Sequence, residues 1–386
     1  MNMKKICFLL LIFSLFPFNI LAQTTNEADV TQNAKSAIVI ENTTGKILYN
    51  KNANQITSVA SLTKMMGLIL IFDTIEQQGL KYNEMITVSK NAKDMGGSQI
   101  WLEEGEKISV EDLIKGITLA SANDAMVALA ERIAGTEEAF VKLMNNKAKE
   151  LNLKNTHFIN STGLDEEGHY STAYDMAKIA QELLKYEDAL KYTSIYEDYI
   201  RKDTENKSWI VNTNKLVRFY EGVDGLKTGS TEEAGKCMAI TINKNNLRVI
   251  AVTLGYNDTD TRNKETSSLL DYIYNQYEAR VIYKKNDVVT TTKLENANVD
   301  EIDLVTKEDI LVVTKKTDPK EKYQYDIKLN DIKYPIKKGD ILGKLTITNN
   351  NSKIITTDLI TNKNINKINI LSLYFKNLKQ LLTNNY

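Results

Sequence analysis

The feature that most constrains this fold is the shortage of cysteine in a chain that begins like an exported protein. Two early lysines precede an apolar run over Ile6–Phe18, and Ala22 provides a small residue before a cleavage point. This order predicts a signal peptide over residues 1–22, with an uncleaved N-terminal anchor as the alternative. Cys237 is then the one cysteine of the mature chain, so no internal disulfide can form. A hydrophobic core must therefore hold the fold, and the apolar neighbours of Cys237 predict a buried, inert thiol.

The composition excludes several classes of function. The chain has 49 Lys+Arg against 50 Asp+Glu, a net charge of −1. Nucleic-acid-binding proteins usually carry a strong basic excess, so we expect no nucleic acid partner. Its two histidines, His157 and His169, are a poor basis for metal ligation. We expect no metal and no cofactor, and we predict packing or loop roles for both histidines.

A first domain is predicted over residues 23–280, where strand and helix signals alternate. The signals are an edge hairpin at 37–49, a helical middle from about 61, two late buried strands at 238–242 and 249–254, and a closing helix around 269–277. Within the helical middle, Thr172 and Asp175 form a capping box. This order predicts the α+β class, an antiparallel sheet with helices packed on it.

The sequence changes character over residues 281–361. Short runs rich in threonine and valine, such as Ile310–Thr314 and Leu345–Thr348, are separated by Asp, Lys, Asn and Gly. Helical periodicity is not sustained in this stretch. The pattern predicts a small β-sandwich domain.

The last segment, residues 363–386, has a helical pattern. Its apolar residues recur at steps of three or four and share one helical face: Ile365, Ile368, Leu371, Phe375, Leu378 and Leu382. Four lysines and no acidic residue accompany them. The apolar runs are too short to span a bilayer, so we predict an amphipathic helix lying in an anionic membrane surface. A terminal helix docked on its own protein is the alternative.

Three short motifs carry the candidate chemistry. Ser61 and Lys64 are three residues apart, so on a helix they share one face and the amine can reach the hydroxyl. Ser121–Asn123 (Ser-Ala-Asn) adds a second hydroxyl and an amide, and Lys227–Gly229 (Lys-Thr-Gly) adds a second amine. Each motif is short enough to arise by chance. In this order, however, they form the motif set of serine penicillin-recognising enzymes.

With these motifs, the chain resembles the D-alanyl-D-alanine carboxypeptidases, the low-molecular-mass penicillin-binding proteins that trim peptidoglycan stem peptides. Further matching segments extend across nearly the whole mature chain, at Gly45–Tyr49, Asn155–Phe158, Gly163–Asp165, His169–Ala177, Asn212–Leu216 and Gly225–Gly229. The resemblance implies a β-lactamase/transpeptidase-like catalytic domain, followed by a β-sandwich spacer and a membrane-surface helix. Three positions depart from the family pattern: Val59 replaces a common proline, Gly67 a threonine and Ser230 a histidine.

The chemistry of the motifs gives the two lysines opposite roles. Ser61 is the candidate nucleophile of an acyl-enzyme, and Lys64 is the base within its reach. A free lysine has a pKa of about 10.4, which must fall by about 3.4, equivalent to about 4.6 kcal/mol, for half of the amine to be neutral at pH 7. Burial and a neighbouring cation can supply this, and Lys227 is the candidate cation.

The resemblance implies the remaining roles in the site. Ser121 relays the proton to the leaving D-alanine, and Asn123 binds a peptide amide. Lys227 and Thr228, next to Gly229, hold the terminal carboxylate of the substrate. The backbone N–H groups of Ser61 and Ser230 form the oxyanion hole.

The implied partners are peptidoglycan stem peptides and, as covalent inhibitors, β-lactam antibiotics. The signal and the tail together predict an exported protein on the outer face of the cytoplasmic membrane. There it would act in peptidoglycan synthesis, cell wall biogenesis and cell shape.

Two alternatives share the motifs. A class A β-lactamase needs an added glutamate in a Glu-x-x-Leu-Asn pattern, and here Ala148 stands in that place before Leu151. A catalytically silent cell-wall-binding protein would keep the fold without the chemistry, but all motif side chains are intact. Outside the motifs, we predict Trp101 as a core anchor, with a place in the cleft as the alternative, and Asp124 and Asp175 as helix caps.

Overall fold

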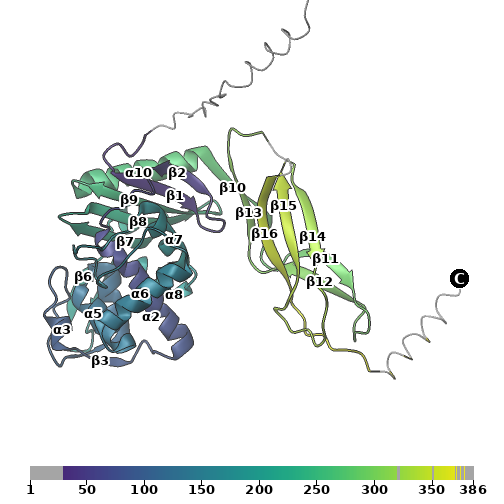
Figure 1. The fold of residues 1–386 in the computed structure, drawn as a ribbon, viewed down its shortest axis with the longest axis horizontal. Coiled ribbons are helices and arrows are strands. Elements are labelled where there is room, and N and C mark those ends of the chain that lie inside the picture. Colours follow the sequence, from purple (N-terminus) through teal and green to yellow (C-terminus); the bar gives the residue numbers. More distant parts are fainter. Residues whose placement is uncertain are drawn as a thin grey trace, which may run out of the picture.

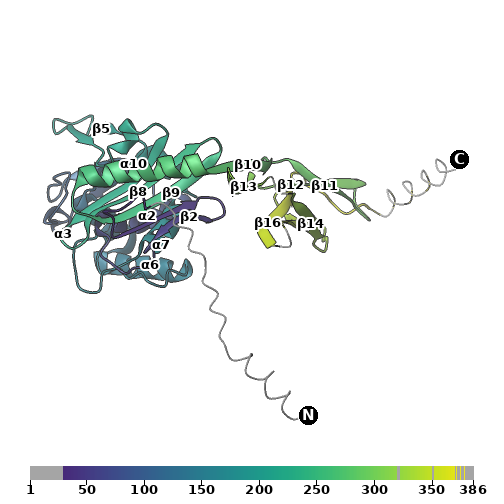
Figure 2. The same cartoon turned by 90° about the horizontal axis from the view of Figure 1, so that it is seen from above.

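The computed structural model describes residues 29–319, 322–349 and 352–369, together with Leu371, Tyr374 and Leu378. These residues form a unit of helices around a sheet, followed along the chain by a unit made of strands (Figures 1 and 2). The predicted α+β class of the first unit and the predicted β-sandwich of the second are confirmed. The predicted signal peptide, residues 1–22, lies outside the described residues.

The first unit is built on a five-stranded antiparallel sheet with the order β2-β1-β9-β8-β7. Its strands are β1 (Ser36–Glu41), β2 (Ile47–Lys51), β7 (Val223–Thr231), β8 (Gly235–Lys244) and β9 (Leu247–Tyr256). Ser36 pairs with Leu254, so segments from the two ends of this unit complete one sheet. Strand β7 is left at the sheet edge, and it carries the Lys-Thr-Gly motif.

Helices cover both faces of this sheet (Figures 1 and 2). On one face lies α10 (Thr259–Gln276), whose Leu269, Leu270 and Ile273 are buried against alternate residues of the strands. The other face packs on a larger helical group made of α2 (Lys64–Gln78), α5 (Asn123–Ala134), α6 (Glu137–Glu150), α7 (Ala173–Leu183) and α8 (Glu187–Thr193). Burial on both faces explains why the late strands are nearly continuous apolar runs.

Short elements connect the larger ones. They are η2 (Ala60–Thr63), β3 (Met85–Thr87), α3 (Lys90–Lys93), β4 (Lys107–Ser109), α4 (Val110–Lys115), η3 (Gly116–Ala120), β5 (Glu197–Ile200), β6 (Ser208–Val211) and α9 (Leu216–Phe219). The predicted start of α7 is confirmed, because Thr172 Oγ1 accepts from the backbone N–H of Asp175 at 3.0 Å. The predicted capping role of the Asp175 carboxylate is wrong. That carboxylate instead accepts from Asn155 N and Thr156 Oγ1 and fixes the loop before the helix.

The second unit contains two sheets with a core of its own. Strands β10 (Tyr277–Tyr283) and β13 (Ile310–Lys315) form a pair, and the larger sheet has the order β11-β12-β16-β15-β14. Its strands are β11 (Val288–Lys293), β12 (Glu301–Thr306), β14 (Gln324–Leu329), β15 (Ile341–Asn349) and β16 (Ser352–Thr361). Leu304, Leu345 and Leu359 are fully buried in this core.

The start of the predicted tail helix at residue 363 is wrong. Ile365 forms a β-bridge with Ile336 and is 1% exposed within the core of the second unit, and Lys367 forms a bridge with Ala297. Residues 363–369 therefore continue the β unit. Ile365 fits the helical repeat in the sequence, but its side chain fills the core of the β unit and does not belong to a helix face. Leu371, Tyr374 and Leu378 are helical and exposed, and the rest of the segment from residue 370 lies outside the described residues. Within the described part of the chain, none of the helices combines the length and apolar character needed to cross a membrane.

This correction makes a prediction about stability. Ile365→Ala should lower the stability of the β unit by about 2–5 kcal/mol, because it leaves a cavity in a small core. The matched change Leu371→Ala, at a residue 73% exposed, should have little effect. Hydrogen exchange of strands β12, β15 and β16 measures the difference. Equal protection in the two variants would contradict the assignment of Ile365 to this core.

Candidate active site

The three motifs meet at one cleft, although they come from different elements. Ser61 lies on the short helix η2 and Lys64 begins α2 directly after it. Ser121 follows the π-helical turn η3 in a left-handed conformation, with φ 62°, and Asn123 begins α5. Lys227 lies on the edge strand β7. Helix start, turn and sheet edge thus bring the five side chains together.

Lys64 is held in a geometry suited to a general base. Its Nζ lies 2.9 Å from Ser61 Oγ, 2.6 Å from Asn123 Oδ1 and 2.8 Å from Thr162 O, and the side chain is completely buried. A neutral amine has two hydrogens and one lone pair. The two carbonyl oxygens can take both hydrogens, since neither can donate, and the lone pair is then left for the Ser61 hydroxyl.

Asn123 differs from its expected contact with a peptide amide. Its Oδ1 accepts from Lys64, and its Nδ2 donates to Gly96 O at 2.6 Å, with the residue 3% exposed. Both polar atoms of the amide are therefore engaged inside the protein. In this structure Asn123 positions the base.

The second lysine is coupled to the second serine. Lys227 Nζ donates to Ser121 Oγ at 2.7 Å and to Thr228 O at 3.0 Å. Thr228 Oγ1 donates to Thr213 Oγ1 at 2.7 Å. Ser121 is thus hydrogen-bonded to Lys227.

Burial weakens the proton affinity of both amines. Desolvation, followed by the positive charge of Lys227, holds the pKa of Lys64 well below its usual range. Desolvation and then Arg262 lower the pKa of Lys227 to about 7. The pKa of Lys64 is lowered, as expected, and burial is the larger cause. Lys227 differs from the expected permanent cation, because a pKa of about 7 brings the loss of its proton into the neutral range.

Gly229 and Gly163 allow two backbone segments to approach the nucleophile closely. A Cβ on Gly229 would lie 3.0 Å from Val59 O and 3.1 Å from Ser61 N. A Cβ on Gly163, which has φ 82°, would lie 2.0 Å from Ala60 O. Strand β7 and the 160–165 loop can therefore press against the turn that carries Ser61. This contact brings the segment containing Ser230 next to the Ser61 N–H, as the expected oxyanion hole requires.

The cleft has a volume of about 460 Å³, and its lining includes Ser61, Ser121, Thr228, Gly229 and Ser230. Three cations that sequence reasoning missed, Lys215, Lys236 and Arg262, also line it. Lys236 Nζ donates to Ser230 Oγ at 2.7 Å. Arg262 is 3% exposed and reaches the cleft from α10. No local pattern in the sequence separates it from other helical arginines.

The remaining predictions around the cleft have mixed outcomes. Nε2 of His169 lies 2.8 Å from Thr63 Oγ1, its Nδ1 accepts from Ile159 N, and burial lowers its pKa to about 4, which confirms a neutral structural histidine. Cys237 is buried, and burial raises the pKa of its thiol to about 11, as expected for an inert group. The core role predicted for Trp101 is wrong, because the side chain is 76% exposed.

Comparisons with known proteins match the whole described architecture. The D-alanyl-D-alanine carboxypeptidase family matches residues 22–258, and the C-terminal domain of penicillin-binding protein 5 matches residues 277–367. D-alanyl-D-alanine carboxypeptidase DacF of Bacillus subtilis is 45% identical, over 89% of this chain and 89% of its own. DacC of Escherichia coli is 31% identical, over 92% of this chain and 89% of its own. Penicillin-binding protein 5 of Haemophilus influenzae superposes with a TM-score of 0.70 at 27% identity, over 87% of this chain and 98% of its own. The chain belongs to the D-alanyl-D-alanine carboxypeptidase family of serine hydrolases.

Proposed function

We propose that this enzyme removes the terminal D-alanine from peptidoglycan stem peptides through an acyl-enzyme on Ser61. The single observation that carries the proposal is the buried Lys64 Nζ at 2.9 Å from Ser61 Oγ, with its other two partners both acceptors. Family membership supports this substrate, since the curated relatives are D-alanyl-D-alanine carboxypeptidases.

Acylation begins when Lys64 takes the Ser61 proton and Oγ attacks the carbonyl carbon of the penultimate D-alanine. The N–H groups of Ser61 and Ser230 stabilise the oxyanion. When the C–N bond breaks, the leaving amine receives a proton through Ser121. Water then attacks the ester, with Lys64 again as base, and Ser61 regains its proton.

The terminal carboxylate of the substrate binds at Lys227 and Thr228. A carboxylate at that position favours the charged form of Lys227 and raises its pKa when the substrate binds. The amine, which loses its proton in the neutral range in the free enzyme, thus becomes the cation that the substrate needs. Arg262, at the same wall of the cleft, adds a fixed positive charge.

β-Lactams would acylate the same serine, because their strained amide presents a similar carbonyl and carboxylate. Rapid hydrolysis of that adduct, the β-lactamase alternative, needs a glutamate where Ala148 stands. Ala148 is 2% exposed within α6, in the hydrophobic core. The structure therefore offers no carboxylate from that position.

The direct experiment measures D-alanine released from diacetylated Lys-D-Ala-D-Ala. Ser61→Ala should lower kcat by about 10⁴-fold or more, since it removes the nucleophile. Fluorescent penicillin should label the wild type and not the variant. Undiminished release by Ser61→Ala would overturn the proposal. A folded wild type that neither releases D-alanine nor takes the label would support the silent wall-binding alternative, and fast turnover of penicillin would support a β-lactamase.

The pH profile of kcat/KM tests the role of Lys227. This ratio reports the free enzyme, so it should fall about tenfold per pH unit above about 7, as Lys227 loses the proton that binds the carboxylate. Lys227→Arg keeps its charge at all accessible pH values, so the decline at high pH should disappear even if the maximum is lower. An unchanged decline in Lys227→Arg would assign that titration to another group.

We also propose that the tail holds the enzyme on the outer face of the cytoplasmic membrane, where it serves cell wall biogenesis and cell shape. Leu371, Tyr374 and Leu378 are spaced three and four residues apart on one helical face, and they are 73%, 62% and 40% exposed. Two lysines, Lys376 and Lys379, lie on either side of Leu378 in the sequence and favour anionic head groups.

Deletion of residues 370–386 should move the protein to the soluble fraction with its activity on the diacetylated tripeptide retained. The deletion starts after Ile365 so that the β unit keeps its core. Fractionation of cells measures the result, and a signal-cleaved full-length chain is the control. Continued membrane association of the truncated, signal-cleaved chain would reject the tail as the anchor.

A further inference from the structure

The chain has two tryptophans, and both line one groove outside the cleft just described. This groove has a volume of about 620 Å³ and lies between the loop around Trp101 and the β5–β6 hairpin, which carries Trp209. The two indoles are 76% and 59% exposed. Large exposed aromatic side chains gathered at one hollow are typical of binding sites, whereas scattered ones are ordinary.

We propose that this groove binds sugar rings of the glycan strand to which the stem peptides are attached. The inference rests on the proposed function for the identity of the substrate, but it concerns a separate surface. Pyranose rings have flat faces of C–H groups and edges of hydroxyls and amides. They therefore suit indole faces flanked by neutral polar groups.

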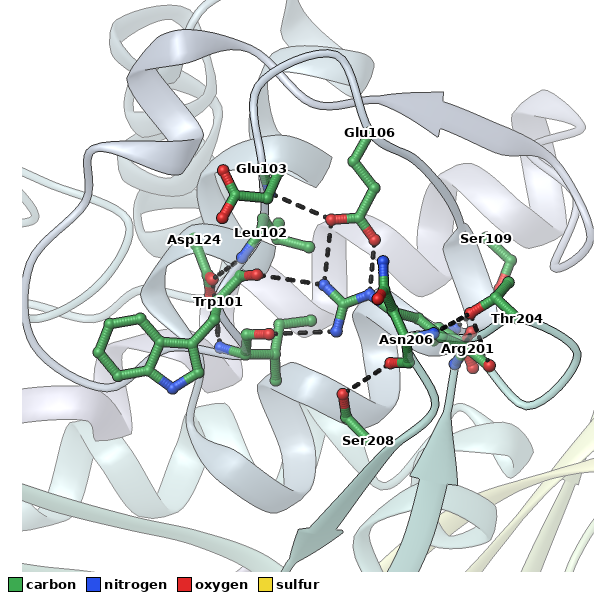
Figure 3. A network of polar contacts seen from close by, with 12 residues as sticks. Trp101, Leu102, Glu103, Glu106, Ser109, Asp124, Arg201, Thr204, Asn206 and Ser208 are labelled. Atoms are coloured by element: carbon green, nitrogen blue, oxygen red, sulfur yellow. Dashed lines mark hydrogen bonds and ion pairs between the residues drawn. The ribbon is translucent and has the colours of Figure 1, made fainter.

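The backbone at Trp101 is fixed in a strained conformation. Its φ is 58°, a left-handed value that a bulky residue rarely adopts and that costs about 1–3 kcal/mol. The buried Asp124 and the partly buried Arg201 hold it on either side. The Asp124 carboxylate accepts from Ile100 N and Leu102 N, and Arg201 donates to Ile100 O and Trp101 O. Figure 3 shows the indole directed away from this network. The protein thus fixes the Trp101 backbone while leaving the ring uncovered.

The four charged residues that line the groove, Glu103, Glu106, Arg201 and Lys207, carry no net formal charge. Arg201 forms two hydrogen bonds with the Glu106 carboxylate, at 2.5 and 3.1 Å (Figure 3). Lys207 Nζ lies 4.2 Å from the centre of the Tyr199 ring. The neutral side chains of Gln99, Asn206 and Ser208 also line the groove. An anionic polymer would need an excess of positive charge, which this lining lacks, whereas sugar hydroxyls and N-acetyl groups need neutral donors and acceptors.

The groove adjoins the cleft along the chain. At three places, residues close in the chain line different cavities. Ser98, Ser121 and Thr213 line the cleft. Their near neighbours Gln99, Ala120 and Val211 line the groove. A polymer that presents a peptide end to Ser61 therefore meets the two indoles on the adjoining surface. This adjacency selects the glycan of the substrate as the occupant.

A comparison of two substrates tests the inference. One is the diacetylated tripeptide, and the other is a stem peptide ending in D-Ala-D-Ala attached to its disaccharide. Trp209→Ala should lower the ratio of kcat/KM for the disaccharide substrate to that for the tripeptide about tenfold, through KM. Trp101→Ala should change the ratio in the same direction. Phe219→Ala, at an aromatic residue 68% exposed outside the groove lining, is the matched control and should leave the ratio unchanged.

Intrinsic fluorescence gives a second readout that does not need catalysis. Because both tryptophans line the groove, their emission should change and saturate as a peptide-free glycan of N-acetylated amino sugars is added. The affinity should fall in Trp209→Ala and stay unchanged in Phe219→Ala. An unchanged substrate ratio together with silent emission overturns the inference. So does emission that responds to a sugar-free stem peptide and not to the glycan. If the wild type cleaves neither substrate, the proposed function fails, and the titration still decides the groove.

Discussion

The structure of the site depends on one energetically unfavourable feature, the complete burial of the Lys64 amine. An ammonium group in that position would lose its hydration, so the fold favours the neutral form and makes a base of the lysine. Asn123 and Thr162 offer carbonyl oxygens that a neutral amine can satisfy, which fixes the direction of its lone pair. Lys227 and Arg262 lie behind it as further buried or nearly buried cations. Besides burial, the charge of Arg262 lowers the pKa of Lys227, and that of Lys227 lowers the pKa of Lys64.

The parts that the sequence predicted are those governed by local spacing. The three-residue step from Ser61 to Lys64 predicts their contact once the segment is helical, and the late apolar runs are short and β-branched, which favours buried strands. The missed parts depend on long-range packing. Arg262 belongs to the cleft because α10 crosses the sheet beneath β8, a relation that no local pattern records. The sequence identified Asn123 as part of the site but did not predict its contact with Lys64. That contact depends on Gly96 O, which accepts from Asn123 Nδ2 and leaves Oδ1 for Lys64.

Two wrong predictions have a common cause. Ile365 and Trp101 were assigned from the usual behaviour of apolar residues, on a helix face and in a core respectively. In the structure Ile365 fills the core of the β unit, while Trp101 is exposed at a groove. Tertiary contacts decide such cases. Bridge formation by residues 336 and 365 draws one side chain inward, and the bonds of Asp124 and Arg201 to the backbone hold the other outside.

Among the described residues, those with positive φ that are neither glycine nor asparagine, namely Ala60, Trp101, Ser121 and Arg201, all border the two cavities. Ala60, Trp101 and Ser121 are all left-handed, with φ of 49°, 58° and 62°, and each such residue costs about 1–3 kcal/mol. Ala60 and Ser121 border the cleft, and Trp101 borders the groove. Cys237 is free, so the described residues contain no disulfide, and these costs must be offset by packing in the cores on the two faces of the sheet. Rigid surroundings thus allow the strained turns to keep Ser61, Ser121 and an uncovered indole in place before any substrate arrives.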